Sequence, residues 1–393
     1  MLYSIKKVHL IGIGGIGMSG IAELLKNKEF VVSGSDIADS PNVQRLIDLG
    51  INVSIGHNKE NISDAELVIY SDAIPKDNAE LIEALAKNII VYSRARMISE
   101  IAKLNNSTVA IAGTHGKTTT TSMVGTILKS MNLDPTIIVG GVVKSLESNS
   151  VLGGGDTFVV EADEYNKSLL HLSPTIAVIN NIDFEHIECY NDIDDLKDTF
   201  LQFANSVPFY GTVCACKDSN NVASILSKID KPVITYGIES QNLDIKAENL
   251  HQENGTISFD VKVKDQIFSV NLSVPGKYNV YNALAALSVC ETMGIDLESA
   301  CKALSNFSGV KRRFDIKANE DIMIIDDYAH HPVEVKNVIE TVKSNWNKNL
   351  NVIFQPHLFS RTKEFYKDFA KALMIADNVM ITEIFASREK EDN

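Results

Sequence analysis

The amino-acid sequence predicts an α/β protein of three domains, and three observations carry this prediction. Two glycine-rich turns, at residues 12–17 and 113–119, each follow an apolar strand and open a helix. A third run of alternating strands and helices begins near residue 310. Such alternation indicates parallel βαβ units. The domains that we expect span residues 1–106, 107–309 and 310–393.

Composition and charge narrow the class of protein. The 393 residues carry a formal net charge of −14, which disfavours nonspecific binding to nucleic acid or to an anionic membrane. No apolar run reaches the ~18 residues that a membrane span needs. The five cysteines show no zinc-like pairing, so we expect reduced thiols and a cytoplasmic location. We expect small-molecule substrates, no nucleic acid, no membrane, and a monomer or homodimer.

The first domain has the features of a Rossmann-like unit. A strand at 7–11 leads into the glycine turn, a helix follows over about 17–28, and strands are expected at 30–33 and 67–71. The turn fits the pattern G-x-G-x-x-G, and Asp36 stands roughly 20 residues further on, as in a dinucleotide-binding unit. Physically, the turn only indicates a diphosphate at a helix N-terminus, so NAD and a nucleotide-sugar both fit. Asp36 suits a uridine or ribose contact and a turn-capping carboxylate equally well.

The second glycine turn is the strongest local signal for function. It reads GTHGKTT over residues 113–119 and lies between the strand 108–112 and a helix. Glycines let backbone N–H groups close around phosphate oxygens, and the helix N-terminus adds a favourable dipole. Lys117 can bridge the β- and γ-phosphates of ATP, and the Thr118 hydroxyl can ligate Mg²⁺. Nucleotide binding is therefore a better interpretation than a turn with an exposed lysine.

Acidic side chains follow two later strands. The strand 157–160 runs into EADE, which begins at Glu161, and the strand 175–179 runs into NNIDFEH, which ends at His186. Ligands bind at the carboxyl ends of strands in open α/β sheets, and Mg²⁺ takes one or two carboxylates together with phosphates. Alone, His186 is better explained as an ordinary histidine. Two acidic strand ends beside a phosphate loop favour a metal site instead.

The rest of the second domain combines two kinds of strand. Strands at 212–215 and 232–236 continue the parallel pattern. Residues 257–263 and 267–274 alternate at period two, which indicates an antiparallel hairpin packed beside the parallel sheet. The segment 279–293 is expected to be a helix that stops at a glycine.

The third domain is expected to be Rossmann-like but truncated. Its predicted strands are 322–325, 351–354 and 378–381, and its predicted helices are 332–343 and 363–376. A doubly wound domain of this length is small. We expect an exposed sheet edge as the consequence.

These motifs together resemble the Mur ligases. The loop at 113–119 is similar to the ATP loop of members that act on muramate-type substrates, and HLIGIGGIGMSG at 9–20 is similar to their UDP-sugar segment. GH at 56–57 and YSDAIP at 70–75 add to the resemblance, which covers nearly the whole chain, although members usually continue further. It implies an enzyme of peptidoglycan precursor synthesis that joins L-alanine to the lactyl carboxylate of UDP-N-acetylmuramate through an acyl phosphate. ATP and Mg²⁺ are the implied cofactors.

The resemblance also implies roles for single residues. The implied UDP-sugar contacts are Gly12, Gly14, Gly15, Gly17, Asp36, His57, Ser71 and Arg94. The implied ATP contacts are Gly113, Thr114, His115, Gly116, Lys117, Thr118, Thr119, Asn279, Asn282, Arg313 and Asp327. The implied amino-acid contacts are Tyr328, His330, His357 and Arg361. The implied metal ligands are Thr118, Glu161 and His186, and the implied catalytic residues are Lys117, Glu161 and His186.

Three other interpretations stay open. A ligase of the same family that attaches a tripeptide to the same sugar shares most motifs, although MSG at 18–20 favours alanine. An NAD-dependent oxidoreductase would explain the first glycine turn but leaves Lys117 and Glu161 without a role. A nucleotide-binding protein without activity would result if the short third domain lacks part of the amino-acid site.

Overall fold

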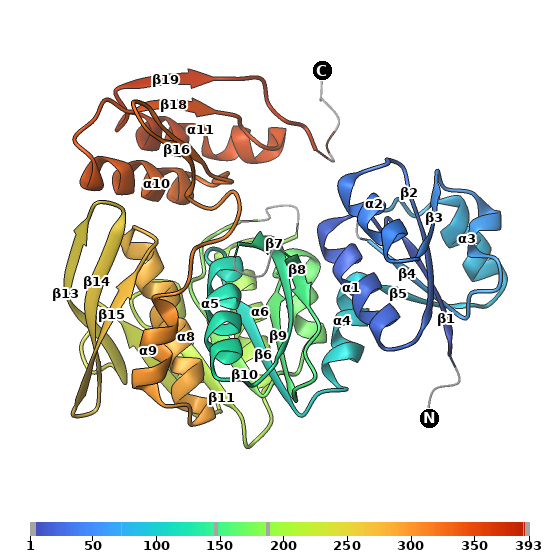
Figure 1. Cartoon of the computed structure of the whole chain (residues 1–393), viewed down its shortest axis with the longest axis horizontal. Helices are drawn as coiled ribbons and strands as arrows, with labels where there is room; N and C mark the ends of the chain where they lie inside the picture. The colour runs from blue at the N-terminus through green and yellow to red at the C-terminus, as the bar shows by residue number, and fades with distance from the viewer. Residues whose placement is uncertain (1–4, 72, 145–147, 186–188, 388, 390–393) are drawn as a thin grey trace.

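The computed structural model describes residues 5–389, apart from 72, 145–147, 186–188 and 388. It has an N-terminal region (residues 5–106), a central region (107–309) and a C-terminal region (310–389), and the first and last of these lie against different sides of the central region (Figure 1). None of the helices in the described part of the chain combines the length and apolar character that a bilayer span needs.

The N-terminal region is a five-stranded parallel sheet in the order β3-β2-β1-β4-β5. Neighbouring residues of its middle strand face opposite sides, as strand geometry requires. Leu10 belongs to a core shared with the first helix, and Ile11 to a smaller core shared with the third. The elements are β1 (Lys7–Ile11), α1 (Ile16–Asn27), β2 (Val31–Asp36), α2 (Pro41–Asp48), β3 (Asn52–Ile55), η1 (Lys59–Ile62), β4 (Leu67–Tyr70), α3 (Ala79–Ala86), β5 (Ile90–Ser93) and α4 (Arg94–Ala102).

The central region is built on a ten-stranded sheet in the order β15-β14-β13-β12-β11-β10-β6-β9-β7-β8. Its strands are β6 (Ser107–Ala112), β7 (Thr136–Val143), β8 (Ser148–Val151), β9 (Thr157–Ala162), β10 (Ile176–Ile179), β11 (Thr212–Cys216), β12 (Val233–Gly237), β13 (Ile245–Glu253), β14 (Thr256–Val263) and β15 (Gln266–Leu272). Its helices are α5 (Lys117–Ser130), η2 (Tyr165–His171), α6 (Ile193–Asn205), α7 (Asn220–Ile225), η3 (Leu226–Lys228), α8 (Lys277–Met293) and α9 (Leu297–Leu304).

The strand before the phosphate loop is buried on both faces. Val109 and Ile111 of β6 pack in a core with α5, α8 and α9. Ala110 and Ala112 face the other way, into a core shared with α6 and with the N-terminal region. The N-terminal and central regions therefore share one apolar core.

The expected hairpin is present, but its relation to the parallel sheet differs from the prediction. β14 and β15 pair antiparallel, as predicted. They do not pack beside the parallel sheet, because β13 joins them to it edge to edge: β13 pairs antiparallel with β14 and parallel with β12. β13 was not predicted from the sequence, because only Ile245, Ala247 and Leu250 of its nine residues are apolar and they do not alternate regularly.

The C-terminal region has β16 (Asp315–Asn319), β17 (Met323–Asp326), α10 (Pro332–Asn345), β18 (Asn351–Phe354), α11 (Phe359–Leu373) and β19 (Asn378–Ile381). The strands form two small sheets, β16-β17 antiparallel and β18-β19 parallel, rather than one doubly wound sheet. A small core joins α10, β18 and α11. β19 is exposed along its whole length.

Candidate active site

Two glycines shape the phosphate loop between β6 and α5. Gly113 has a φ of +143° and Gly116, the N-cap of α5, has a φ of +80°, conformations that favour glycine. A Cβ atom on Gly113 would lie 2.9 Å from the Cβ of Asn180, and one on Gly116 would lie 2.4 Å from Oδ1 of Asn282. Both positions therefore need glycine for conformation and for space.

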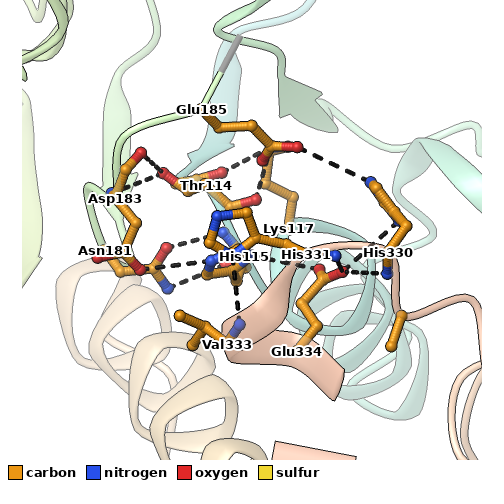
Figure 2. Close-up of polar contacts among 12 residues, drawn as sticks. Thr114, His115, Lys117, Asn181, Asp183, Glu185, His330, His331, Val333 and Glu334 are labelled. Atoms are coloured by element: carbon orange, nitrogen blue, oxygen red, sulfur yellow. Dashed lines mark hydrogen bonds and ion pairs between the residues drawn. The ribbon is translucent and has the colours of Figure 1, made fainter. Parts of the chain in front are cut away.

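The chain that follows β10 braces this loop (Figure 2). The His115 N–H donates to Asn181 Oδ1 at 2.7 Å, and Asn181 Nδ2 donates to the His115 carbonyl at 3.1 Å. The Thr114 hydroxyl donates to the Asp183 carbonyl at 3.0 Å and accepts from the Asp183 N–H at 2.9 Å. Contacts within the protein thus pre-form the loop, so the loop loses less conformational entropy when it binds a phosphate ligand.

Lys117 lies inside the loop and pairs with Glu164. Its Nζ donates to the Gly113 carbonyl at 2.6 Å and lies 2.8 and 3.0 Å from the carboxylate oxygens of Glu164. Burial alone would lower the pKa of Lys117, but the charges of Glu164 and Asp163 raise it above its usual value. The ammonium therefore stays charged at any physiological pH, as the stabilisation of phosphate oxygens requires.

Thr118 and Glu161 meet beside the loop, as a shared metal site would require. Glu161 accepts a hydrogen bond from the Gly140 N–H at 2.7 Å and another from the Thr118 hydroxyl. Burial raises the pKa of Glu161, and these two hydrogen bonds oppose the rise. Among the described residues no group of three or more His, Cys, Asp or Glu side chains is arranged to hold a metal ion, but Mg²⁺ needs only one or two carboxylates beside phosphates. Thr118 and Glu161 fit that ion, whereas His186 lies outside the described residues.

A cavity of about 890 Å³ opens beside the loop, between the central and C-terminal regions. Every predicted ATP contact except Gly113 lines it. Asn279 and Asn282 on α8 are buried, and the Asn282 side chain bonds Asn279 and Thr120. Gly276 is the N-cap of α8, and Asn279 Nδ2 donates to the Pro275 carbonyl at 2.7 Å. The volume suits a ligand the size of a nucleotide.

Two residues of the C-terminal region, Asp327 and Arg313, line this cavity. The Asp327 carboxylate accepts the N–H groups of Phe314 at 2.6 Å and of Ala329 at 2.7 Å. Burial raises the pKa of Asp327 to about 6, against these hydrogen bonds and the charge of Arg313. Arg313 also lies 3.8 Å from Glu334.

His115 connects the phosphate loop to α10 (Figure 2). Its Nδ1 lies 3.2 Å from Glu334 Oε1, and its Nε2 lies 3.3 Å from Asp183 Oδ2, in the geometry of an ion pair rather than a directed hydrogen bond. Burial would lower the pKa of His115, but Asp183 and Glu334 raise it to about 10. Glu334 also forms a capping box with His331 at the start of α10. A charged histidine therefore joins the central and C-terminal regions.

The four predicted amino-acid contacts gather around Glu185. Arg361 Nη2 donates to Glu185 Oε1 at 2.5 Å, and Arg361 Nη1 lies 3.1 Å from His357 Nδ1. His330 Nε2 lies 3.9 Å from Glu185, and the rings of His330 and Tyr328 meet edge to face at 5.0 Å. Arg361 is buried, and burial lowers the pKa of His330. This group of cationic and neutral donors can hold a carboxylate.

The glycine turn of the N-terminal region has its own network. The Gly14 N–H donates to Asp36 Oδ2 at 2.8 Å, and the Ala38 N–H to Oδ1 at 3.2 Å. Asp36 is thus a turn-capping carboxylate in this structure, and its contact with uridine or ribose stays a prediction. A Cβ on Gly17 would lie 2.5 Å from Arg94 Nη1, so Arg94 lies against the start of α1.

None of the predicted UDP-sugar residues lines the cavity beside the phosphate loop. The glycine turn contains Gly12 and Gly15, and Ser71 lies beside it. A Cβ on Gly12 would lie 3.4 Å from the Cβ of Ser71. His57 contacts the Ser35 hydroxyl at 3.0 Å. The link to the central region is Arg94, which lies 3.8 Å from Asp163, a residue of the cavity lining.

Three carboxylates of this site were not predicted from the sequence. Glu164, Glu185 and Glu334 pair with Lys117, Arg361 and His115 respectively. The sequence separations of these pairs are 47, 176 and 219 residues, so no local motif reveals them. The only local signals were that Glu164 and Glu185 stand in the acidic strand ends already noted.

A preformed phosphate loop, a carboxylate–hydroxyl pair and a cavity completed by a third α/β region define a nucleotide-dependent enzyme. Known families match in three parts: the Mur ligase family, catalytic domain, at residues 7–106, the Mur ligase middle domain at 111–290, and the Mur ligase, glutamate ligase domain, at 312–393. The chain belongs to the Mur ligase family.

Individual relatives agree with this assignment. A UDP-N-acetylmuramate--L-alanine ligase of Sulfurihydrogenibium sp. (strain YO3AOP1) is 45% identical over 98% of this chain and 84% of its own. The crystal structure of UDP-N-acetylmuramate-alanine ligase MurC from Thermotoga maritima is similar with a TM-score of 0.84 and 32% identity, over 97% of this chain and 86% of that one. A murein peptide ligase from Psychrobacter arcticus 273-4 shares the fold, with a TM-score of 0.77 and 24% identity, over 96% and 91%.

Proposed function

We propose that this chain joins L-alanine to the lactyl carboxylate of UDP-N-acetylmuramate, with cleavage of ATP to ADP and phosphate, in peptidoglycan precursor synthesis. The observation that carries the proposal is the cavity between the central and C-terminal regions, with the phosphate loop on one wall and the Arg361 cluster beyond Glu185. The relatives at 42–45% identity are named for this reaction.

Each region has a part in the proposal. The N-terminal region, a Rossmann-like unit, binds the UDP-sugar, with the residues Gly12, Gly14, Gly15, Gly17, Asp36, His57, Ser71 and Arg94. The central region binds ATP through the loop and through Asn279 and Asn282, and the C-terminal region closes the site with Arg313 and Asp327. Tyr328, His330, His357 and Arg361 bind the amino acid, the last two through its carboxylate.

The chemistry has two steps. A lactyl carboxylate oxygen attacks the γ-phosphorus of ATP, the bond to the bridging oxygen breaks, and ADP leaves. The amine of L-alanine then attacks the acyl carbon, an N–C bond forms, and the C–O bond to the phosphate breaks. The leaving phosphate takes the electron pair of that bond and the proton that the amine nitrogen loses. Lys117 stays charged and neutralises the phosphoryl oxygens, which carry the developing charge. Thr118 and Glu161 would hold Mg²⁺, which would supply further positive charge to stabilise the transferred phosphoryl group.

The fold also protects the acyl phosphate from water. Its hydrolysis would waste ATP, and closure of domains over an active site excludes water. Ion pairs at His115–Glu334 and Arg361–Glu185 already hold the C-terminal region against the loop. We also propose a cytoplasmic location, because the reaction consumes ATP and the four buried cysteines form no disulfide.

Phosphate release from ATP tests the proposal. With UDP-N-acetylmuramate and each amino acid added singly, we expect release with L-alanine, and a ranking that sets L-serine and glycine below it. Release with the tripeptide but not with L-alanine would favour the recycling ligase. Quenching of NADH fluorescence in the absence of UDP-sugar binding would favour the oxidoreductase. If the protein binds nucleotide but releases no phosphate with any amino acid, the remaining interpretation is a nucleotide-binding protein without activity.

A further inference from the structure

Glu80 is a buried carboxylate for which the proposed reaction has no role. It lies at the start of α3 with no exposed surface. It accepts hydrogen bonds from Ser35 Oγ at 2.6 Å, Asn61 Nδ2 at 2.6 Å and the Asn58 N–H at 3.2 Å, and it lies 3.2 Å from His9 Nε2. Burial would raise the pKa of Glu80, but the hydrogen bonds from His9, Ser35 and Asn61 lower it below the usual value. Glu80 is therefore ionised and can only accept.

The negative charge of Glu80 determines which ring nitrogen of His57 carries the proton. His57 Nδ1 lies 3.0 Å from Ser35 Oγ and 3.6 Å from Glu80 Oε1. Ser35 has one hydroxyl hydrogen, and that hydrogen goes to Glu80. The Ser35 oxygen must then accept from His57, so Nδ1 carries the ring proton. Because neutral imidazole has a single N–H, Nε2 carries a lone pair.

The free nitrogen of His57 is available to a ligand. The side chain is 15% exposed, and Nε2 meets no partner within the described part of the chain. The Gly56 N–H donates to the Asp36 carbonyl at 2.8 Å, so His57 stands beside the carboxyl end of β2. In Rossmann-like units a diphosphate lies at the N-terminus of the first helix, and the nucleoside extends across the end of β2.

We propose that Glu80 and Ser35 are positioning residues that lock His57 in the Nδ1–H tautomer, so that Nε2 accepts a hydrogen bond from the nucleoside half of the UDP-sugar. This inference rests on the proposed function for the identity of the ligand, but its first part concerns the free protein alone. The nucleoside offers two kinds of donor, the uracil N3–H and the ribose hydroxyls.

The tautomer can be read directly by NMR. Two-bond ¹H–¹⁵N correlations of the ¹⁵N-labelled full chain, at a pH near 8, distinguish a protonated Nδ1 from a protonated Nε2. The His57→Gln variant identifies the His57 signals by their loss. We expect the Nδ1–H pattern for His57. The Nε2–H pattern for His57 in the wild-type chain overturns the proposal.

Two serines of the same strand form a matched pair of variants. Ser35→Ala removes the acceptor of the His57 proton, whereas Ser33→Ala removes only the partner of His9 Nδ1, at 2.9 Å. We expect Ser35→Ala to shift His57 towards the Nε2–H tautomer and to raise the Kd for UDP by about 5–10-fold, the loss of about one hydrogen bond. The KM for the UDP-sugar should rise, whereas kcat and the KM for ATP should stay unchanged. Ser33→Ala should leave all of these at the wild-type values, and equal effects of the two variants contradict the proposal.

Nucleotide analogues identify the donor. CDP lacks the N3–H, and 2′-deoxy- and 3′-deoxy-UDP each lack one ribose hydroxyl. Weaker binding of CDP that disappears in His57→Gln places the donor on the base, and the same result with a deoxy analogue places it on the ribose. If no analogue binds less tightly than UDP, His57 accepts nothing from the nucleoside and the proposal fails. These binding measurements need no turnover, so failure of the ligase assay alone sinks the proposed function and leaves the tautomer result standing.

Discussion

The ammonium of Lys117 is already paired within the protein, and we expect it to exchange these partners for phosphate oxygens during the reaction. It now pairs with Glu164 and the Gly113 carbonyl, and phosphate oxygens would take their place in the reaction. We predict that Lys117→Ala lowers the rate of phosphate release at least ~100-fold, because the charge that stabilises the transferred phosphoryl group is lost. Binding of UDP, measured by calorimetry, should be unchanged, since the N-terminal site lies apart from the ATP cavity.

A lysine of the same helix serves as the control. Lys129 lies exposed in the last turn of α5. Lys129→Ala should keep wild-type phosphate release. If Lys117→Ala also kept it, the loop would not be the site of phosphoryl transfer.

Single residues of the site were predictable from the sequence where several functional side chains stand next to one another in the chain. GTHGKTT and EADE each show a set of functional groups beside a strand end, and the structure brings Thr118 and Glu161 together. Glu185 and Glu334 were not predictable as site residues, because their partners come from another region of the chain. The loop-bracing role of Asn181 is likewise a property of neighbouring strands in the fold.

At the level of elements, the charged His115 of the phosphate loop pairs with Glu334 of α10. The pKa of His115 is raised to about 10 from the ordinary 6.5, so its charge stabilises the fold in full below pH ~6.5, and this contribution is lost as the pH rises through about 10. We predict that His115→Gln lowers the unfolding midpoint most near pH 6 and little above pH 10. Thermal unfolding of both proteins across that range measures the difference, and a difference independent of pH would contradict the ion pairs.

The contact of α11 with the chain after β10 gives a second prediction. Arg361→Ala should raise the KM for L-alanine at least ~10-fold, because the buried guanidinium is the main cation for a carboxylate, with little effect on the KM for ATP. Arg361→Lys should not restore the wild-type value, since an ammonium lacks the planar fork. Lys363→Ala, an exposed change on the same helix, is the matched control. Equal KM values for L-alanine in the Arg361→Ala and Lys363→Ala variants would remove Arg361 from the amino-acid site.

Elements were predictable from the sequence when they are apolar and interior. β1, β4, β6 and β10 were expected close to their observed bounds because both of their faces are buried. β3 and β5 were missed, since these four-residue strands lie at the edges of the N-terminal sheet and are partly exposed.

The hydrophobic cores divide the whole molecule into two parts. One apolar core runs through the N-terminal and central regions, whereas the core of the C-terminal region is confined to α10, β18 and α11. The C-terminal region contacts the central region through two ion pairs, His115–Glu334 at the phosphate loop and Arg361–Glu185 after β10. We predict by hydrogen exchange that amides of α11 exchange faster than those of β6 and α5, and that ATP with UDP-N-acetylmuramate slows exchange at the start of α10. Equal protection of α11 and β6 without ligands would show that the three regions unfold as one unit.

The proposed reaction brings three reactants together on this chain and ends in an amide bond. Mass spectrometry of the reaction of ATP, UDP-N-acetylmuramate and ¹⁵N-labelled L-alanine tests it most directly. We predict a UDP-sugar product heavier by one alanine residue, with the label retained, and one ADP and one phosphate for each product formed. Release of phosphate without that product, or no reaction at all with folded protein, would contradict the proposed reaction.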